Sequence, residues 1–308
     1  MTDKVLFITD AYRDLNIKKD TSILMIEEAI SLGLNTFQCE INDLYVDEDI
    51  VYAASREILS AGSTQVEGIL KQEIRLSDFK FSFMRKDPPV NKNYMNALHL
   101  LGLAEKQGAV VFNKPKAIKE FNEKIFALHF KEFIPKTLVT SDINKIENFF
   151  ELHKTIIIKP VDGMGGASIY KIDELNEENK GLLIKMTNSQ QTHIICQEFI
   201  QDIYDGDFRI LIIHGKPFQK TLARIPQGNS FKGNLAAGGR GEARDISDYQ
   251  KMIAKQVGEY LIEKHINFAG IDVIGKHLTE INITSPTCAR EILDQTGLNP
   301  IAEYFKGL

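Results

Sequence analysis

A lysine followed by closely spaced glycines is the first group of residues that could do chemistry. Lys159 ends an isoleucine run, and Gly163, Gly165 and Gly166 follow it. Because glycine has no Cβ, its backbone N–H groups can converge on an anion, and a lysine is rarely buried without a partner. The loop is neither a Walker A motif nor a Rossmann fingerprint, since a strand pattern follows the glycines. The pattern predicts a phosphate cover, with a plain glycine hairpin as the alternative.

Two carboxylates and an amide stand on a second hairpin pattern. A three-residue hairpin loop would pair Ile274 with Leu278. Asp272 would then lie directly across from Glu280, and Asn282 would share the face of Glu280. Facing carboxylates repel each other unless a cation lies between them, and hard oxygen ligands suit Mg²⁺. The spacing supports a metal site and an exposed polar face of a hairpin about equally.

Glycine is too frequent for regular structure between Arg224 and Gly241, and this stretch predicts a long, mobile loop. Long glycine-rich loops often act as lids that keep water from a reactive intermediate, and otherwise serve as linkers. Leu235 with its two following alanines is poor linker composition, which favours a lid. The candidate lid residues are Gly228, Lys232, Gly233, Gly238, Gly239 and Arg240.

Three weaker signals involve charged side chains. Arg85 and Asp87 precede two prolines after a strand pattern, which suits a carboxylate-binding site or a surface turn. Lys124 lies in a helix pattern, where a solvated lysine is the default interpretation. Asp207 and Arg209 alternate at the start of a strand, which is more typical of a structural salt bridge than of a catalytic pair.

The elements that must position these residues follow two patterns. Up to about residue 122, an apolar run at 4–9, a helix pattern after Asp20 and a further strand at 81–85 indicate an α/β domain. Antiparallel sheet dominates the rest. Its predicted strands are 155–159, 167–172, 194–200, 208–214, 219–225, 268–274 and 278–284, and its predicted helices are 118–130, 174–187 and 248–263.

Composition excludes several classes of protein. The net charge of -5 argues against a sequence-independent grip on nucleic acid or on an anionic membrane. No apolar run approaches the roughly 20 residues of a membrane span, and the start of the chain shows no signal peptide. We therefore expect a cytoplasmic protein. Cys39, Cys196 and Cys288 lack metal or disulfide spacing, which predicts buried free thiols.

Six strings of the chain resemble bacterial glutathione synthetase, in order and with fitting spacing over nearly the whole length. They are FMRKDPP, NEKIF, IIIKPVDGMGGASIYK, DGDFRILI, LARIPQGNSFKGNLAAGGRGE and GIDVIGKHLTEINITSPTCAREI. The resemblance implies a mixed α/β fold of the ATP-grasp type, with two sheet-based subdomains clamping ATP. It places an N-terminal α/β substrate domain at 1–122, a central subdomain with the glycine loop at 123–200, and a C-terminal subdomain with the metal site and the lid at 201–308.

The resemblance also implies a role for each candidate residue. It assigns ATP binding to Lys124, Lys159, Gly163, Gly165, Gly166, Ser168, Gln197, Glu198, Phe199, Ile200 and Asp207. It assigns substrate binding to Arg85, Asp87, Asn282, Ser285, Pro286 and Thr287, and the metal to Asp272, Glu280 and Asn282. Arg209 would stabilise charge at the reacting carboxylate, and Arg224 would hold phosphate and substrate.

The implied reaction joins γ-glutamylcysteine to glycine through an acyl phosphate, with ATP as co-substrate and Mg²⁺ as cofactor, or Mn²⁺ as an alternative ion. The family also suggests a homotetramer. Another ATP-grasp ligase with a different acceptor, and a non-catalytic ATP-binding protein, are the alternatives. One departure stands at the lid tip, where Lys232 replaces an expected arginine. Lysine keeps the charge but loses the bidentate fork.

Overall fold

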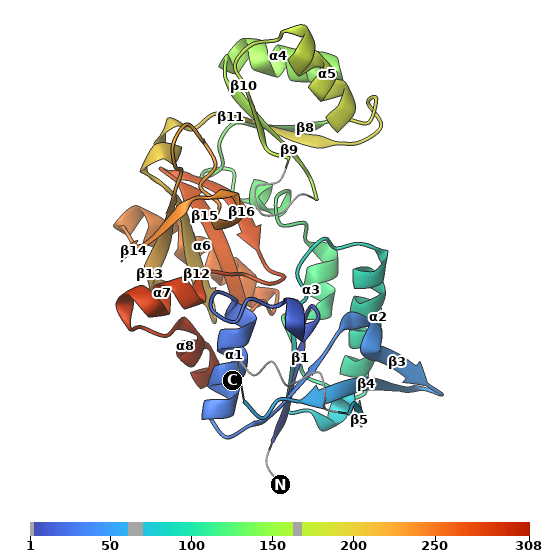
Figure 1. Cartoon of the computed structure of the whole chain (residues 1–308). Helices are drawn as coiled ribbons and strands as arrows, with labels where there is room; N and C mark the ends of the chain where they lie inside the picture. Colours follow the sequence, from blue (N-terminus) through green and yellow to red (C-terminus); the bar gives the residue numbers. More distant parts are fainter. Residues whose placement is uncertain (1–2, 61–69, 163–167) are drawn as a thin grey trace.

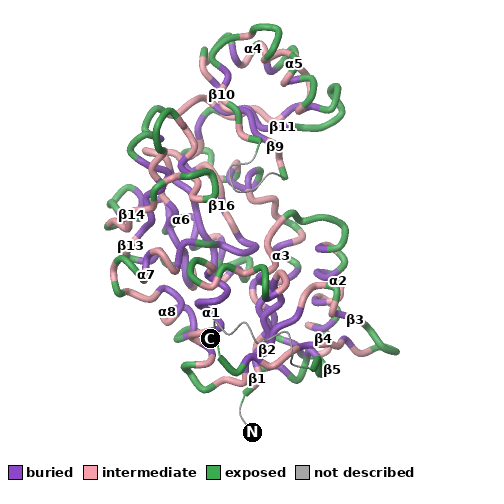
Figure 2. Tube along the Cα trace, viewed as in Figure 1, coloured by how far each residue is buried: buried purple, intermediate pink, exposed green. Residues whose placement is uncertain are grey.

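The computed structural model describes residues 3–60, 70–162 and 168–308 of the chain, arranged as three sheets with flanking helices (Figure 1). The mixed α/β class expected from the sequence is confirmed. Figure 2 shows that buried segments concentrate in the sheets and exposed ones in the connecting turns. No helix among these described residues is long and apolar enough to span a membrane.

The N-terminal sheet has parallel strands at its centre and antiparallel strands at one edge, in the order β3-β4-β2-β1-β6-β7 with β5 on β4. Its strands are β1 (Lys4–Ile8), β2 (Asn35–Cys39), β3 (Leu44–Asp47), β4 (Ile50–Glu57), β5 (Gln72–Arg75), β6 (Phe81–Met84) and β7 (Val111–Phe112). Helices α1 (Thr21–Ser31), α2 (Lys92–Lys106) and α3 (Pro115–Glu120) accompany it. Arg85 and Asp87 follow the carboxyl end of β6, the edge of a parallel sheet where ligands usually bind.

Side-chain alternation assigns each face of β1 to a different helix. Val5 and Phe7 pack in one cluster with α1, whereas Leu6 and Ile8 pack in another with α2. The α1 cluster also contains residues from the end of the chain, among them Phe268 and Tyr304. The two terminal parts of the chain therefore share one hydrophobic core.

The central sheet has the order β10-β9-β11-β8 and its own core. Its strands are β8 (Thr137–Thr140), β9 (Ile156–Pro160), β10 (Tyr170–Ile172) and β11 (Ile194–Glu198), and its helices are α4 (Ile143–His153) and α5 (Glu177–Met186). All buried members of that core lie between residues 146 and 196. This part forms the upper body in Figure 1.

The C-terminal sheet is antiparallel, with the order β14-β13-β12-β15-β16. Its strands are β12 (Asp207–Ile213), β13 (Lys216–Ile225), β14 (Arg240–Asp245), β15 (Phe268–Ile274) and β16 (His277–Asn282), and its helices are α6 (Asp248–Glu263), α7 (Ala289–Thr296) and α8 (Pro300–Lys306). Ile210 and Ile271 pack with α6 on one face. Leu211 and Phe268 pack on the other face, against the N-terminal part.

The predicted helix at 118–130 is wrong. Helix α3 ends at Glu120, Phe121 is extended, and only a short 3-10 turn forms at Phe126–His129. The Asn122 side chain accepts hydrogen bonds from the backbone N–H groups of Lys124 and Ile125, at 3.1 and 3.0 Å. Such a local side-chain hydrogen bond competes with continuation of the helix, so the helix does not extend through Asn122.

Two further expectations are corrected in the C-terminal sheet. Asp272 does lie opposite Glu280, but Val273 pairs with Leu278 because a bulge interrupts the register. The predicted pairing of Ile274 with Leu278 is therefore wrong. The glycine-rich stretch also contains more regular structure than predicted, because β13 reaches Ile225, β14 begins at Arg240 and a 3-10 turn forms at Leu235–Ala237.

Candidate active site

One face of the C-terminal sheet gathers the predicted charged residues. Arg209 lies opposite Asp272 across β12 and β15, and Arg224 lies opposite Asp207 across β12 and β13. Asp272 in turn lies opposite Glu280 on β16. Because directly opposed residues share a face, the register alone brings these five side chains together.

The two arginines and two aspartates form a continuous ion-pair network. Arg209 binds Asp272 with two nitrogens, Nε to Oδ1 at 2.6 Å and Nη2 to Oδ2 at 3.1 Å. Nη2 of Arg224 lies 2.9 Å from Oδ2 of Asp272 and 2.5 Å from Oδ2 of Asp207. The expected salt bridge between Asp207 and Arg209 does not form. Asp207 instead pairs with Arg224 on β13, and Arg209 pairs with Asp272 on β15.

The pKa values of the two buried aspartates are shifted in opposite directions. Burial would raise the pKa of Asp272, but the charges of Arg209 and Arg224 outweigh it and hold that pKa well below its usual range. Burial raises the pKa of Asp207 to about 6, against the opposing charge of Arg224. Oδ1 of Asp207 is buried and has no hydrogen-bond partner in the described structure. Asp272 is therefore the fixed anion of the network.

Gly270 makes room for this network on β15. A Cβ at this position would lie 2.8 Å from Cδ of Arg209 and 3.2 Å from Cβ of Pro286. The stem of Arg209 can therefore lie flat against the sheet only because residue 270 has no side chain. A glycine inside a strand pattern was the sequence signal for this close approach.

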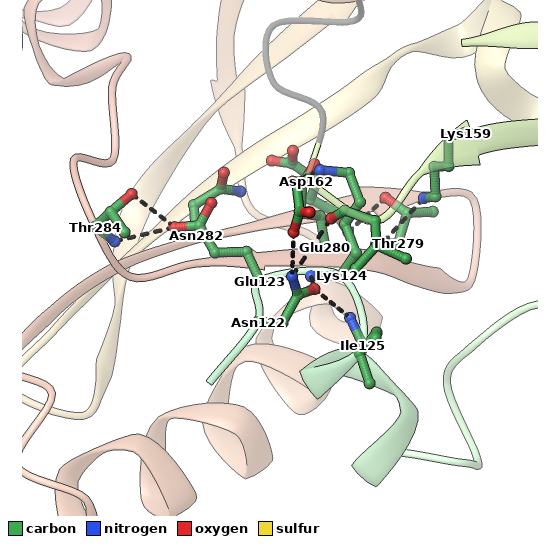
Figure 3. Close-up of polar contacts among 12 residues, drawn as sticks. Asn122, Glu123, Lys124, Ile125, Lys159, Asp162, Thr279, Glu280, Asn282 and Thr284 are labelled. Atoms are coloured by element: carbon green, nitrogen blue, oxygen red, sulfur yellow. Dashed lines mark hydrogen bonds and ion pairs between the residues drawn. The ribbon is translucent and has the colours of Figure 1, made fainter. Parts of the chain in front are cut away.

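Two buried lysines meet the acidic edge of the same face, as Figure 3 shows. Nζ of Lys124 lies 3.1 Å from Oε1 of Glu280, so the predicted solvated lysine is in fact buried. Lys159 comes from β9 of the central sheet and donates to the carbonyl of Thr279 at 3.5 Å. Burial lowers the pKa of Lys159. Both ammonium groups thus lie between the central and C-terminal sheets.

A cleft of about 860 Å³, partly open to solvent, separates these two sheets. Its lining is partly charged, with Lys124, Lys159, Asp207, Asp272 and Glu280, and partly apolar, with Ile157, Phe199, Ile200, Ile203 and Ile274. Such a mixed lining suits a molecule that carries both phosphates and a flat apolar ring.

The predicted hinge residues Gln197, Glu198, Phe199 and Ile200 all line this cleft. The Gln197 amide donates to Oγ1 of Thr137 at 3.0 Å, and the Glu198 carboxylate accepts from the N–H of Lys136 at 2.9 Å. Their side chains are thus committed to the central part. The backbone N–H groups of Glu198 and Phe199 also donate within the central part, to the carbonyls of Lys136 and Thr155, both at 3.1 Å.

The glycine-rich loop between β13 and β14 covers part of the cleft. Phe231, Lys232, Gly233 and Asn234 line the cleft. Nζ of Lys232 lies 5.9 Å from the ring centroid of Tyr170 on β10, which is within the range of a cation–π contact. The loop therefore reaches across to the central part of the molecule.

The other predicted lid residues lie farther from the cleft. Gly228, Gly238 and Gly239 belong to the loop but are not among the residues that line the cleft. Arg240 is exposed on β14 and pairs with Glu242 at 2.7 Å, so it belongs to the sheet. Ser168 is exposed with φ of 56°. Gly163, Gly165 and Gly166 lie outside the described residues.

The predicted substrate residues meet at the segment 283–287, which follows β16. Arg85 donates to the carbonyl of Pro286 at 3.0 Å, and the Ser285 hydroxyl donates to Asp87. From the other side, Nη1 of Arg209 donates to Oγ1 of Thr287 at 3.4 Å. The segment therefore bridges the carboxyl end of β6 and the charged face of the C-terminal sheet.

The oxygen ligands proposed for a metal lie in different local environments. Asp272 is bound by two arginines and Glu280 by Lys124, whereas the Asn282 amide donates to the carbonyl of Gly270 at 3.3 Å. Among the described residues, no three His, Cys, Asp or Glu side chains are grouped to hold a metal. A site here would depend on the mixed set of carboxylates and one amide.

All three cysteines are buried and unpaired, as predicted. Cys288 lies beside Thr287, and burial raises the pKa of its thiol. A thiol that stays protonated is a poor nucleophile. This agrees with an arrangement in which no cysteine takes part in covalent chemistry.

Sequence reasoning missed Glu123, Thr284 and Asn113. Glu123 accepts three hydrogen bonds from the segment that contains Thr284. The Asn113 side chain makes four hydrogen bonds, which join the end of β7 to Asn267, Phe268 and Ile283. A Glu beside the candidate Lys124 was visible in the sequence, but its partner 161 residues away was not.

Comparisons with known proteins place this geometry in a family. The N-terminal domain model of prokaryotic glutathione synthetase matches residues 4–119, and the ATP-grasp domain model of the same enzyme matches residues 123–297. The glutathione synthetase of Vibrio parahaemolyticus is 44% identical over 292 residues, which cover 94% of this chain and 92% of the relative. That of Escherichia coli K12 is 40% identical with the same coverage.

Solved structures share the fold at lower identity. The D-cycloserine synthetase DcsG superposes with a TM-score of 0.69 at 12% identity, covering 98% of this chain and 97% of its own. The ATP-grasp ligase PsnB, solved with a phosphomimetic variant of a minimal precursor, Mg and ADP, gives 0.63 at 16%, covering 99% and 98%. The matched domains and the relatives together show that this chain belongs to the prokaryotic glutathione synthetase family, within the ATP-grasp ligases.

Proposed function

We propose that this chain catalyses the ATP-dependent ligation of γ-glutamylcysteine and glycine to glutathione, with release of ADP and phosphate. The observation that carries the proposal is the cleft between the two sheets, with apolar lining residues, two buried lysines and an arginine network beside the segment 283–287. Curated relatives over nearly the full length bear the name of this activity. The chain is thus an ATP-dependent carboxylate–amine ligase.

The nucleotide would lie in the cleft, with its base against the apolar lining residues. The backbone of residues 197–200 would contact the adenine edge, and Asp207 would lie at the inner side of the cleft. Lys124 and Lys159 would bind phosphate oxygens, which are the anions that buried ammonium groups need. Ser168 and the glycines before it would cover the phosphates. On binding, Lys124 would exchange its contact with Glu280 for a phosphate.

The residues of the charged face fit a magnesium ion. Glu280 supplies a carboxylate and Asn282 an amide, both of them hard oxygen donors. Because the Asn282 nitrogen is committed to Gly270, its oxygen is the atom left to accept. Glu280 and Asn282 would therefore hold the ion together with Asp272, whose oxygens would be shared with Arg209 and Arg224, with Mn²⁺ as an alternative. When bound, Mg²⁺ supplies positive charge that neutralises the phosphates.

The proposed reaction has two steps. An oxygen of the dipeptide carboxylate attacks the γ-phosphorus, and the bond between that phosphorus and ADP breaks. The glycine amine then attacks the carbonyl carbon, loses a proton and displaces phosphate. Arg209 would stabilise the developing negative charge, since it is held rigidly by Asp272 and reaches Thr287 at the substrate side. Arg224 would contribute from the adjacent strand, and Arg85, Asp87 and residues 285–287 would orient the substrates.

Water must be excluded during these steps, because an acyl phosphate is hydrolysable. The loop between β13 and β14 is placed for this task, with residues 231–234 already at the cleft. We expect a single cut near Gly233 to lower glutathione formation by about 100-fold, the scale on which misplaced groups slow a reaction. ATP affinity should change much less, because most of the cleft lies outside the loop.

Calorimetry with ATP and an assay of glutathione would separate the two effects in the cut protein. A cut at Glu48, in the turn between β3 and β4, is the matched control because it lies outside the cleft residues. Unchanged ligation after a verified cut near Gly233 would reject the lid role.

The proposed function is tested by ADP and phosphate release from the purified protein with ATP and Mg²⁺. γ-Glutamylcysteine plus glycine is compared with each alone and with D-alanine, and the product is identified by mass. We expect turnover to require both substrates and to yield glutathione. Turnover with another pair only would keep the ligase chemistry and replace the substrates, and ATP binding without any turnover would favour a non-catalytic protein.

Three further proposals accompany this function. Residues 1–122 would act as a substrate domain, with 123–200 and 201–308 as the two halves of the ATP clamp. The homotetramer and the cytoplasmic location expected from the sequence stay predictions. Light scattering after gel filtration and cell fractionation would check them.

A further inference from the structure

A short segment before the 3-10 turn joins the two halves of the candidate site. Residues 122–124 run beside β16, and the N–H of Ile281 donates to the carbonyl of Glu123 at 3.0 Å. Figure 3 shows Lys124 and Glu123 on this segment, with Lys124 beside Glu280 and the carboxylate of Glu123 toward Thr284. Consecutive side chains thus reach the nucleotide side and the substrate side.

One oxygen of Glu123 collects three donors from the segment 283–287. Oε1 accepts from the N–H of Ile283 at 2.9 Å, from the N–H of Thr284 at 3.0 Å and from the Thr284 hydroxyl at 2.8 Å. Hydrogen bonds to an ionised acceptor are stronger than neutral ones, and three together fix a backbone conformation. The contact therefore sets the path of the chain immediately before Ser285.

Glu123 is largely buried near the carboxylate of Glu280. Burial raises its pKa, and the charge of Glu280 raises it further. Glu123, Lys124 and Thr284 also line a second pocket, partly open to solvent, whose lining includes Pro88 and Asp162. Lys124 lines both this pocket and the nucleotide cleft, so Glu123 lies next to the residue that the two share.

We infer that Glu123 is a positioning residue of the ligase. Its carboxylate fixes the segment 283–287, which orients the substrates. Glu123 itself belongs to the short segment 122–124, which also presents Lys124 to the nucleotide. This inference rests on the proposed function. It requires that removal of the carboxylate loosens the substrate side while the nucleotide side, held by Lys159 and residues 197–200, stays in place. Glu123 itself need not touch a substrate.

Steady-state kinetics of Glu123→Ala test the inference, because the substitution should change KM for one of the two ligated substrates much more than KM for ATP. We expect KM for the dipeptide or the amino acid to rise about 10- to 100-fold, the scale of lost charge-assisted hydrogen bonds. KM for ATP should change less than about threefold. Glu123→Gln keeps an acceptor oxygen without the charge, so it should fall between the wild type and Glu123→Ala.

Thr284 offers a matched pair of variants that does not alter Glu123. Thr284→Val removes one donor to Oε1 and should raise the same KM by a smaller factor, whereas Thr284→Ser keeps the hydroxyl and should resemble the wild type. If Glu123→Ala does not fold, the comparison of Thr284→Val with Thr284→Ser decides the result. Equal changes in all three KM values, or Thr284→Val indistinguishable from Thr284→Ser, would overturn the inference.

The same assay of the wild type distinguishes failure of this inference from failure of the proposed function. If the wild type makes no glutathione, the proposed function fails and the inference falls with it. If the wild type makes glutathione and the variants show no substrate-side change, only the inference fails.

Discussion

Glu280→Gln is expected to abolish nearly all Mg²⁺-dependent turnover while the protein folds normally. The substitution keeps the shape of the side chain but removes a charge that faces Asp272 and contacts Lys124. Removing one preorganised electrostatic group from an active site costs about 100- to 1,000-fold in rate. We expect a loss of at least that size, measured as ADP release over a titration of Mg²⁺.

Glu259→Gln is the matched control, because Glu259 is exposed on α6, the helix on the opposite face of the sheet. It should turn over like the wild type. Full activity of Glu280→Gln at every Mg²⁺ concentration would remove Glu280 from the metal site and leave its contact with Lys124 as its only role.

Asp272→Asn should destabilise the fold more than any other single change on this face. Two guanidinium groups share its carboxylate, and both are buried. Breaking a buried ion pair from one side costs about 3–5 kcal/mol, since the remaining charge is left uncompensated. The midpoint of urea unfolding should therefore fall clearly, and catalysis should be lost as Arg209 loses its anchor.

Asp245→Asn provides the comparison for this loss. Asp245 pairs with Lys220 across β13 and β14 at 2.7 Å, but its side chain is 86% exposed. Water screens such a pair, so the unfolding midpoint should stay unchanged. A normal midpoint for Asp272→Asn would show that Arg209 and Arg224 find other partners.

The pH dependence of the Asp272→Asn penalty has a defined sign. The folded pKa of Asp272 is depressed, so its stabilising contribution is fully present above the ordinary carboxyl value of about 3.9. The contribution is lost only as pH falls below that value. The penalty should therefore be the same at pH 7.5 and pH 8.5, both of which lie above the pKa of about 6 of the neighbouring Asp207, and urea unfolding at the two values would check this.

Strand patterns in the C-terminal half were readable from the sequence because glycine turns separate them. The predicted helix 248–263 is confirmed with the same bounds, since Ser247 and Gln250 form a capping box at its start. The helices α2 and α4 were missed, although Asn91 and Asp142 cap them and apolar residues recur at helical spacing. These caps and this spacing are signals from which both helices could be predicted.

Other features could not be predicted from local sequence. The bulge that shifts Val273 against Leu278 depends on how two strands pair, not on either strand alone. Likewise, the sequence placed Arg209 beside Asp207, but the chain folds so that its partner is Asp272, 63 residues away. Residue types predicted the members of the site, whereas their pairing depends on tertiary register.

The hydrophobic core shared by the two ends of the chain also constrains how the protein folds during its synthesis. Val5 and Phe7 pack in one cluster with Phe268 and Tyr304, whereas the buried core residues described in the central part all lie between residues 146 and 196. Contacts between distant residues form late, and nascent chains fold in order of emergence. A chain stalled on the ribosome before β15 would therefore carry a folded central part, but the α1 face of its N-terminal sheet would lack the contacts with Phe268 and Tyr304. The apolar side chains left exposed on that face are a natural target for chaperones.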